Sequence, residues 1–426
     1  MQEKLLQFIW QYSLYRPDAI FTTRGEPVQI IHPGTLNRDA GPDFSNARIR
    51  IGKTTLAGNI ELHVRTSDWA RHGHSADTAY RNIILHAVYE NDVDATPAGI
   101  PVIEMKGRVP EYVLEQYSGL LHTTHELPCH AHLKALSPIT KESWLSRLLV
   151  ERWEQKLERW KAELQACGGS WQELLYQKLA ENFGFKVNAA PFKMLAQSLP
   201  LSILQKQSAA LAIEALVFGQ SGLLQDADED DYVRALRQEY AFHRQKHHLN
   251  PLPAHLWKYL RMRPANFPTV RLAQFAALMQ QVTSLFSRIQ SAPGTEALTA
   301  LLDVTASKYW DTHYRFGAAQ EKASPKKLGT STAENIVMNT IAPALFLYAH
   351  TQGRQQDQER ALEIMDGLPA EDNHILRLWQ EWGWKPLNAA QSQAQLQLYN
   401  HYCAPKRCLE CALGLKIIRT GPDKVY

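Results

Sequence analysis

The chain has 426 residues, which is too long for one ordinary hydrophobic core and predicts two or three domains. Hydrophobic residues make up 45% of the chain and charged residues 21%, a globular composition that excludes wholesale disorder. The formal net charge of +3 excludes a uniformly basic nucleic-acid-binding protein, although it is compatible with a local basic face.

Targeting signals and cysteine usage bear on the cellular compartment. The first residues contain no long apolar stretch followed by a small-residue cleavage site, so no signal peptide is predicted. The longest apolar run, around residues 341–349, is far too short to cross a membrane. The five cysteines are an odd number and make a poor disulfide framework. These features predict a cytoplasmic protein in a reducing compartment, without membrane association.

The predicted elements change character along the chain. Residues 3–14 carry apolar side chains at helical spacing, which predicts a first helix that ends before Arg16-Pro17. Runs typical of strands follow at residues 28–31, 47–51, 56–64, 81–90 and 101–105. A short helix capped by Ser75 or Asp77 is predicted at residues 78–81. From about residue 138 onward, helical spacing dominates.

This order of elements predicts the α+β fold class. A compact α/β domain is expected over residues 1–132, because the strands and the first helix lie there. A mostly helical region that ends in a cysteine cluster is expected over residues 133–426.

Three residues that can bind a metal surround the hairpin predicted between residues 47 and 64. Asp43 enters its first strand, while Glu61 and His63 are two residues apart on the second and so share a face. Such a hairpin would bring two carboxylates and one imidazole together. Mg²⁺ or Mn²⁺ favours oxygen ligands of this kind, and the bound metal lowers the pKa of its water. The same pattern is also typical of a turn aspartate followed by a solvent-facing strand.

Pro42-Asp43, followed after seventeen residues by Glu61-Leu62-His63, resembles the motif of the PD-(D/E)xK nuclease superfamily. The resemblance implies a restriction-endonuclease-like core, metal ligation by Asp43 and Glu61, and a general base or water-orienting group at His63. It also implies DNA or RNA as substrate, and a helper carboxylate on the first helix, where Glu3 is available. His63 stands where lysine is usual. This departure supports the alternative of a catalytically degenerate nuclease fold that binds nucleic acid or protein.

The chain as a whole also resembles an uncharacterised bacterial family, a domain of unknown function. Phrases such as GPDFSNARI, GNIELHVRTSDW and YCAPKRCLECALG carry this resemblance. It covers most of the chain and implies no activity.

Residues beyond the hairpin could contact nucleic acid at the same cleft. Trp69 is a candidate for stacking on a base or sugar. Arg65 and Arg71 are candidates for holding phosphates. The alternative is a polar surface loop.

Histidines are frequent in the same segment. His72, His74 and Asp77 form a metal-like trio that is similar to the box of metallo-β-lactamase-type hydrolases. Asp77 comes one position late and the next histidine of that box is missing, so that fold is not expected. A hydrolase that uses these three residues would require them to converge. His86 lies inside a predicted strand and is expected to be a buried core residue.

The C-terminal segment contains a second metal-like pattern. Cys403, Cys408 and Cys411 fall within nine residues, and the last two have the spacing of a metal knuckle. They predict Zn²⁺ or an iron–sulfur cluster, with His401 or Cys129 as the fourth ligand. The layout with Cys129 is similar to that of certain nucleases of the same superfamily, in which one distant cysteine and three near the C terminus hold an iron–sulfur cluster. The alternative is a group of buried free cysteines that pack as small hydrophobes.

Overall fold

The computed structural model describes residues 1–74, 77–93, 99–227 and 230–420. Contacts between residues divide the chain into two compact units. The first contains Met1–Trp144, Leu378–Trp384 and the chain from Gln397 onward, and the second contains Leu145–Arg377 and Lys385–Leu396. The two domains predicted at 1–132 and 133–426 follow the order of the chain, whereas the first unit also includes C-terminal residues.

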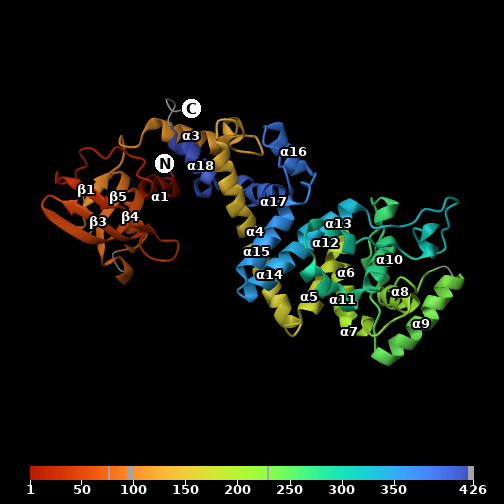
Figure 1. Cartoon of the computed structure of the whole chain (residues 1–426). Helices are drawn as coiled ribbons and strands as arrows, with labels where there is room; N and C mark the ends of the chain where they lie inside the picture. Colours follow the sequence, from red (N-terminus) through yellow and green to blue (C-terminus); the bar gives the residue numbers. More distant parts are fainter. Residues whose placement is uncertain (75–76, 94–98, 228–229, 421–426) are drawn as a thin grey trace. The chain divides into compact units, whose positions relative to one another are not determined.

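The first unit is built on one mixed sheet (Figure 1). Its strands are β1 (Val28–His32), β2 (Thr35–Leu36), β3 (Phe44–Ile51), β4 (Thr54–Arg65), β5 (Ile83–Glu90) and β6 (Val102–Glu104). The order across the sheet is β1-β3-β4-β5-β6, and β2 pairs with β3. Pairing is antiparallel from β1 to β4 and parallel from β4 to β6. β4 is therefore a central strand, and residues of both its faces are buried.

Short helices flank this sheet. The predicted first helix is confirmed as α1 (Glu3–Gln11), which buries apolar residues and contacts β4. α2 (Asp68–Arg71) and the 3-10 turn η2 (Thr78–Tyr80) lie between β4 and β5. The side chain of Asp77 caps η2 by accepting a hydrogen bond from the Ala79 amide (2.9 Å), as predicted. Ser75, the other predicted cap, lies outside the described residues.

The C-terminal segment packs on α3 (Glu111–His122), the helix that follows the sheet. This segment contains the π-helical turn η9 (Tyr399–Cys403), the 3-10 turn η10 (Cys408–Glu410) and α18 (Ala412–Arg419). Figure 1 shows α18 beside α3. The Tyr399 hydroxyl donates to Glu126 (2.7 Å) and Lys406 Nζ donates to the Thr123 carbonyl (3.0 Å). Residues far apart in the sequence therefore form one local structure.

The rest of the chain is mainly helical, as predicted. Its helices are α4 (Pro138–Ala166), α5 (Trp171–Phe183), α6 (Phe185–Ser198), α7 (Leu201–Leu204), α8 (Ala210–Gln220), α9 (Asp231–His247), α10 (Pro268–Met279), α11 (Val282–Ser291), α12 (Thr295–Leu301), α13 (Thr330–Ile336), α14 (Ala342–Thr351), α15 (Gln355–Asp366), α16 (His374–Glu381) and α17 (Ala389–Leu398). Mixed sheet and helices together confirm the α+β class. Among the described helices, none combines the length and apolar character that a membrane crossing requires.

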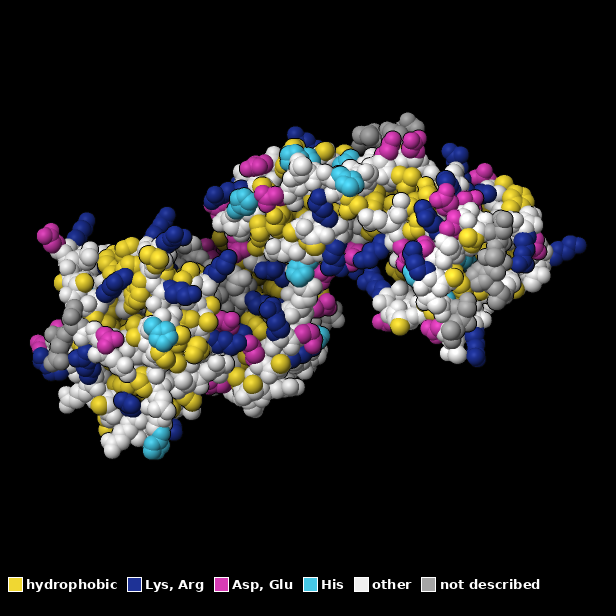
Figure 2. Space-filling model, turned by 180° about the vertical axis from the view of Figure 1, so that it is seen from behind, with side chains coloured by type: hydrophobic (Ala, Val, Ile, Leu, Met, Phe, Trp, Pro, Cys, Tyr) yellow, Lys and Arg dark blue, Asp and Glu magenta, His cyan; other side chains and the backbone are white. Residues whose placement is uncertain are grey.

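Basic side chains are scattered over the surface. On the face shown in Figure 2, Lys and Arg side chains are interspersed with acidic and apolar ones. This distribution agrees with the low formal net charge of +3.

Candidate metal centre

Two carboxylates meet where β3 begins beside β4. Asp43 directly precedes β3, and the antiparallel pairing of Phe44 with Ile60 places it next to Glu61. The Asp43 amide donates to Glu61 Oε2 (3.1 Å), and Asp43 Oδ2 accepts from the Leu62 amide (3.0 Å). The hairpin thus brings together the two carboxylates that the sequence singled out.

Helix α1 supplies a third acid and an amide to this pair. Gln7 Nε2 donates to Asp43 Oδ1 (2.7 Å). Burial raises the pKa of both Asp43 and Glu61 above the ordinary range, and the negative charges of Asp43 and Glu3 raise that of Glu61 further. Two carboxyls in this position resist ionisation unless a cation compensates their charge. The charge distribution therefore fits a divalent cation, and Glu3 lies where a helper carboxylate was expected.

Imidazoles share the face of β4 on which Glu61 lies. The parallel register of β4 and β5 sets Glu61 opposite His86, and His63 follows two residues later. Glu61 is 5% exposed and His63 1%, so the interpretation of this strand as a solvent-facing one is wrong. His86 is buried, as predicted, and its Nε2 lies 2.8 Å from His63 Nδ1.

The ionisation of His63 follows from this environment. Burial lowers its pKa to about 3, and the neighbouring ring of His86 contributes. The ring is therefore neutral at pH 7 and can offer a lone pair to a metal. Nδ1 is engaged by His86, so Nε2 is the nitrogen that faces Glu61 Oε1, at 3.6 Å. Ligation through Nε2 places the proton on Nδ1, where it can be donated to His86.

The turn after β4 folds back over the sheet. Asp68 Oδ2 accepts from the Arg65 amide (3.0 Å), and Asp68 Oδ1 pairs with Arg71 (2.8 Å). These contacts fix α2 against the end of β4. Gly73 then adopts a φ of 72°, a left-handed conformation that favours glycine, and this conformation reverses the chain.

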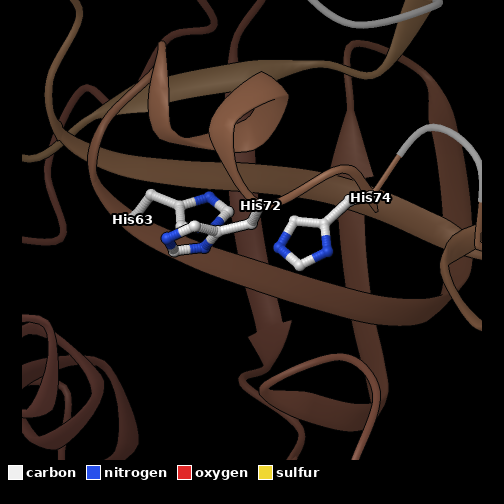
Figure 3. Close-up of side chains that lie close together, drawn as sticks. All are labelled: His63, His72 and His74. Carbon is white, nitrogen blue, oxygen red and sulfur yellow. The ribbon is translucent and has the colours of Figure 1, made fainter.

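The reversal places His72 and His74 over His63. The ligand nitrogens of the three residues all lie within 4.8 Å of one another, and in Figure 3 the His74 ring points toward the other two. His63 Nε2 lies 3.1 Å from His72 Nδ1, and His74 Nε2 lies 3.3 Å from Glu61 Oε1. The buried His74 Nε2 has no hydrogen-bond partner among the described residues. A buried ring nitrogen that lies close to a carboxylate without a hydrogen bond fits a metal ligand.

The loop residues differ from their predicted roles. Asp77 caps η2 and does not belong to the histidine group, so the predicted trio with His72 and His74 does not form as such. Trp69 is 3% exposed and packs against histidine rings, which contradicts its predicted stacking on a base. Arg65 and Arg71 are exposed and remain candidates for contacting phosphates.

His72 and His74 are candidate ligands that the sequence interpretation underrated. A signal was present, because a His-x-His pair directly follows the strand that carries His63. The pair alone did not show that the turn reverses onto that strand.

The four cysteines of the second predicted metal site also lie together. Cys129, Cys403, Cys408 and Cys411 line one small hollow of the first unit. His401, the other predicted fourth ligand, is not among the residues that line it.

The carboxyl pair predicts how the stability of the metal-free protein depends on pH. The folded-state pKa of Asp43 and Glu61 lies above the unfolded value of about 4, so the folded protein retains protons that the unfolded chain releases. The free energy of unfolding should therefore fall as pH rises from about 4 through neutrality. Glu61→Gln cannot ionise at this position and should show a smaller fall in denaturant unfolding with chelator present.

Glu115→Gln is the matched control, because Glu115 is an exposed carboxylate on α3. Its stability should change with pH as that of the wild type does. The same pH dependence in Glu61→Gln and the wild type would rule out a strained carboxyl pair.

Comparison with family models gives a match over residues 3–374 to the family described as "Protein of unknown function (DUF2851)". The chain belongs to this family, which confirms the whole-chain resemblance at that level. Comparison with curated proteins and with solved structures found no match. No comparison supports a relationship to PD-(D/E)xK nucleases, and that resemblance remains a proposal.

Proposed function

We propose that this protein is a metal-dependent phosphodiesterase that hydrolyses nucleic acid at the centre formed by Asp43, Glu61 and His63. The observation that carries the proposal is the convergence of a half-buried carboxylate, a buried carboxylate and a neutral imidazole on one hairpin. Buried acids without a compensating cation are costly to fold, which favours a role in function.

The topology around these residues supports the proposal. A helix precedes four antiparallel strands, of which β2 has only two residues; a short helical segment follows β4, and β5 runs parallel to β4. Apart from β2, this order agrees with the α-β-β-β-α-β core that the nuclease resemblance implies. The Pro-Asp and Glu-x-His motifs then lie at the start of β3 and in the middle of β4.

The ligand set favours a transition-metal ion over Mg²⁺. Asp43 and Glu61 offer oxygens, and His63, His72 and His74 offer nitrogens. Mg²⁺ strongly prefers oxygen ligands and water, whereas Mn²⁺ tolerates both kinds of donor. We therefore expect Mn²⁺ to bind more tightly than Mg²⁺.

A metal bound here would polarise the phosphodiester and lower the pKa of the attacking water. The residues of the chain would position the reactants. Glu61 would orient the water by a hydrogen bond, and His63 would hold the metal through Nε2, which lies 3.6 Å from Glu61 Oε1. The exposed Arg65 and Arg71 would hold flanking phosphates. They would supply positive charge, which lysine contributes in the usual motif and a neutral His63 does not.

The proposal is tested first by titration of chelator-stripped full-length protein with Mn²⁺ in a calorimeter. Wild type should bind, and Glu61→Gln should lose measurable binding because it removes a charged ligand. His74→Ala should weaken binding by about tenfold or more, a loss typical of removing a metal-site contact. Glu115→Gln should bind as the wild type does.

Absence of binding to the wild type, with or without nucleic acid, would refute the metal centre. Binding of Mn²⁺ without cleavage of any nucleic acid would favour the alternative, a catalytically degenerate nuclease fold that binds nucleic acid or protein. The substitution of His63 for the usual lysine is the observation behind that alternative.

A further inference from the structure

Four of the five cysteines gather within the first unit. Each is between 6% and 7% exposed, and none forms a disulfide. They line the same hollow together with apolar residues that include Leu120, Pro128, Leu398 and Leu413. The four are Cys129, which follows α3, and Cys403, Cys408 and Cys411 from the C-terminal segment.

The backbone of the C-terminal segment is shaped around this hollow. Lys406 adopts a φ of 53°, which lets the chain turn between η9 and η10. A Cβ at Gly414 would lie 2.0 Å from the Cys408 carbonyl oxygen, so only glycine allows α18 to approach the knuckle this closely. The turn from Cys408 to Cys411 is therefore held directly against α18.

The surroundings of the sulfurs are apolar, and burial raises the pKa of all four thiols. Burial raises the pKa of the Cys411 thiol, while hydrogen bonds from the Gly414 and Leu413 amides and the Trp144 side chain lower it. Burial and the proximity of the other thiols raise the pKa of Cys129 and Cys403. These thiols must lose their protons when they bind a metal, so metal binding here would release protons.

The spacing of the sulfurs favours a cluster over one metal ion. Within the described ranges, the one group of His, Cys, Asp or Glu ligand atoms that all lie within 4.8 Å of one another is the histidine trio. No three of the cysteine sulfurs are therefore that close together. Tetrahedral zinc has Zn–S bonds of about 2.3 Å, which draw its sulfurs to about 3.8 Å from one another. The thiolates of an iron–sulfur cluster bind different iron atoms and stand farther apart.

We infer that this hollow holds a four-iron iron–sulfur cluster with four thiolate ligands, Cys129, Cys403, Cys408 and Cys411. The cluster links the residues that follow α3 to the C-terminal segment of the same unit. None of its ligands belongs to the acidic centre, which is formed by Asp43, Glu61 and His63. The inference therefore does not depend on the proposed phosphodiesterase activity.

The test is metal and sulfide analysis of the full chain, purified without oxygen or reconstituted with iron and sulfide. Wild type should contain about four irons and four acid-labile sulfides per chain and show the broad visible absorption of iron–thiolate charge transfer. Cys403→Ser should lose most of the cluster. Cys167→Ser is the matched control and should retain it, because Cys167 lies outside the hollow, after α4.

About one zinc per chain without sulfide would overturn the proposal in favour of a single-ion site. A reconstituted wild type without iron or sulfide would overturn it in favour of free packed thiols. Both outcomes are read on the wild type, so they decide the question even if Cys403→Ser does not fold. The Mn²⁺ titration of the acidic centre measures a different site, and its result does not bear on this one.

Discussion

Asp43→Asn is expected to lower the rate of Mn²⁺-dependent nucleic-acid cleavage by at least about 10³-fold, equivalent to about 4 kcal/mol of barrier. The change removes a charged metal ligand and keeps the shape of the side chain. Its remaining oxygen can still accept from the Leu62 amide, which Asp43 does at 3.0 Å. Because the substitution also removes charge repulsion with Glu61, the fold should be retained or stabilised.

The measurement uses labelled single- and double-stranded DNA and RNA, full-length protein, and Mn²⁺ against chelator. Glu115→Gln serves as the surface control and should cleave as the wild type does. Equal rates in Asp43→Asn and wild type would place the activity elsewhere. Comparison across the four substrates would also define the substrate class.

Gly414→Ala is expected to lower the free energy of unfolding of the first unit by about 3 kcal/mol. Its Cβ would lie 2.0 Å from the Cys408 carbonyl oxygen, and a backbone atom cannot move aside as a flexible side chain can. Relief of the clash requires α18 to move away from the knuckle. The cluster content should fall together with stability.

Gly119→Ala is the matched control, since Gly119 lies in α3 of the same unit and a Cβ there meets nothing within 4 Å. It should raise stability by up to about 1 kcal/mol through helix propensity. Hydrogen exchange of peptides from α3 and α18 reports on this unit directly. If hydrogen exchange of these peptides is unchanged in Gly414→Ala, the C-terminal segment tolerates the displacement of α18. The close approach of α18 to Cys408 is then not required.

The strands could be predicted because each carries a local pattern of alternation or of continuous apolar residues. The burial of β4 could not be predicted, since the parallel neighbour β5 comes from a later part of the chain. Alternation in Glu61-Leu62-His63 was therefore compatible with one face in water, whereas both faces are covered. The alternation of polar and apolar residues alone does not show whether the polar face of a strand lies in solvent or binds a ligand inside the protein.

The candidate metal centre likewise contains residues that the sequence predicts and residues that it does not. The pair Asp43 and Glu61 was predicted because a motif and a hairpin suffice to bring them together. The convergence of His72 and His74 depends on the Asp68 contacts and on the left-handed Gly73, which are properties of one turn in three dimensions. No residue pattern in the segment specifies this geometry.

The cysteine set was predicted with two possible fourth ligands, and long-range packing separates them. Cys129 lines the hollow because the C-terminal segment lies on α3, and His401 does not. A contact between residues this far apart in sequence leaves no local trace in either segment.

The chain path of the first unit has a consequence for the order of events during synthesis. The sheet leaves the ribosome early, but the C-terminal segment that packs on α3 is translated only after the helical unit. The helical unit between them can reach its folded state first, since domains generally fold as units while the chain emerges. Until residues 397–420 are made, Cys129 and the apolar residues beside it lack the C-terminal residues that line the hollow with them. A chain cut short just before residue 397 would therefore contain the whole helical unit, whereas the first unit, most of which is made earlier, would lack the segment that packs on α3.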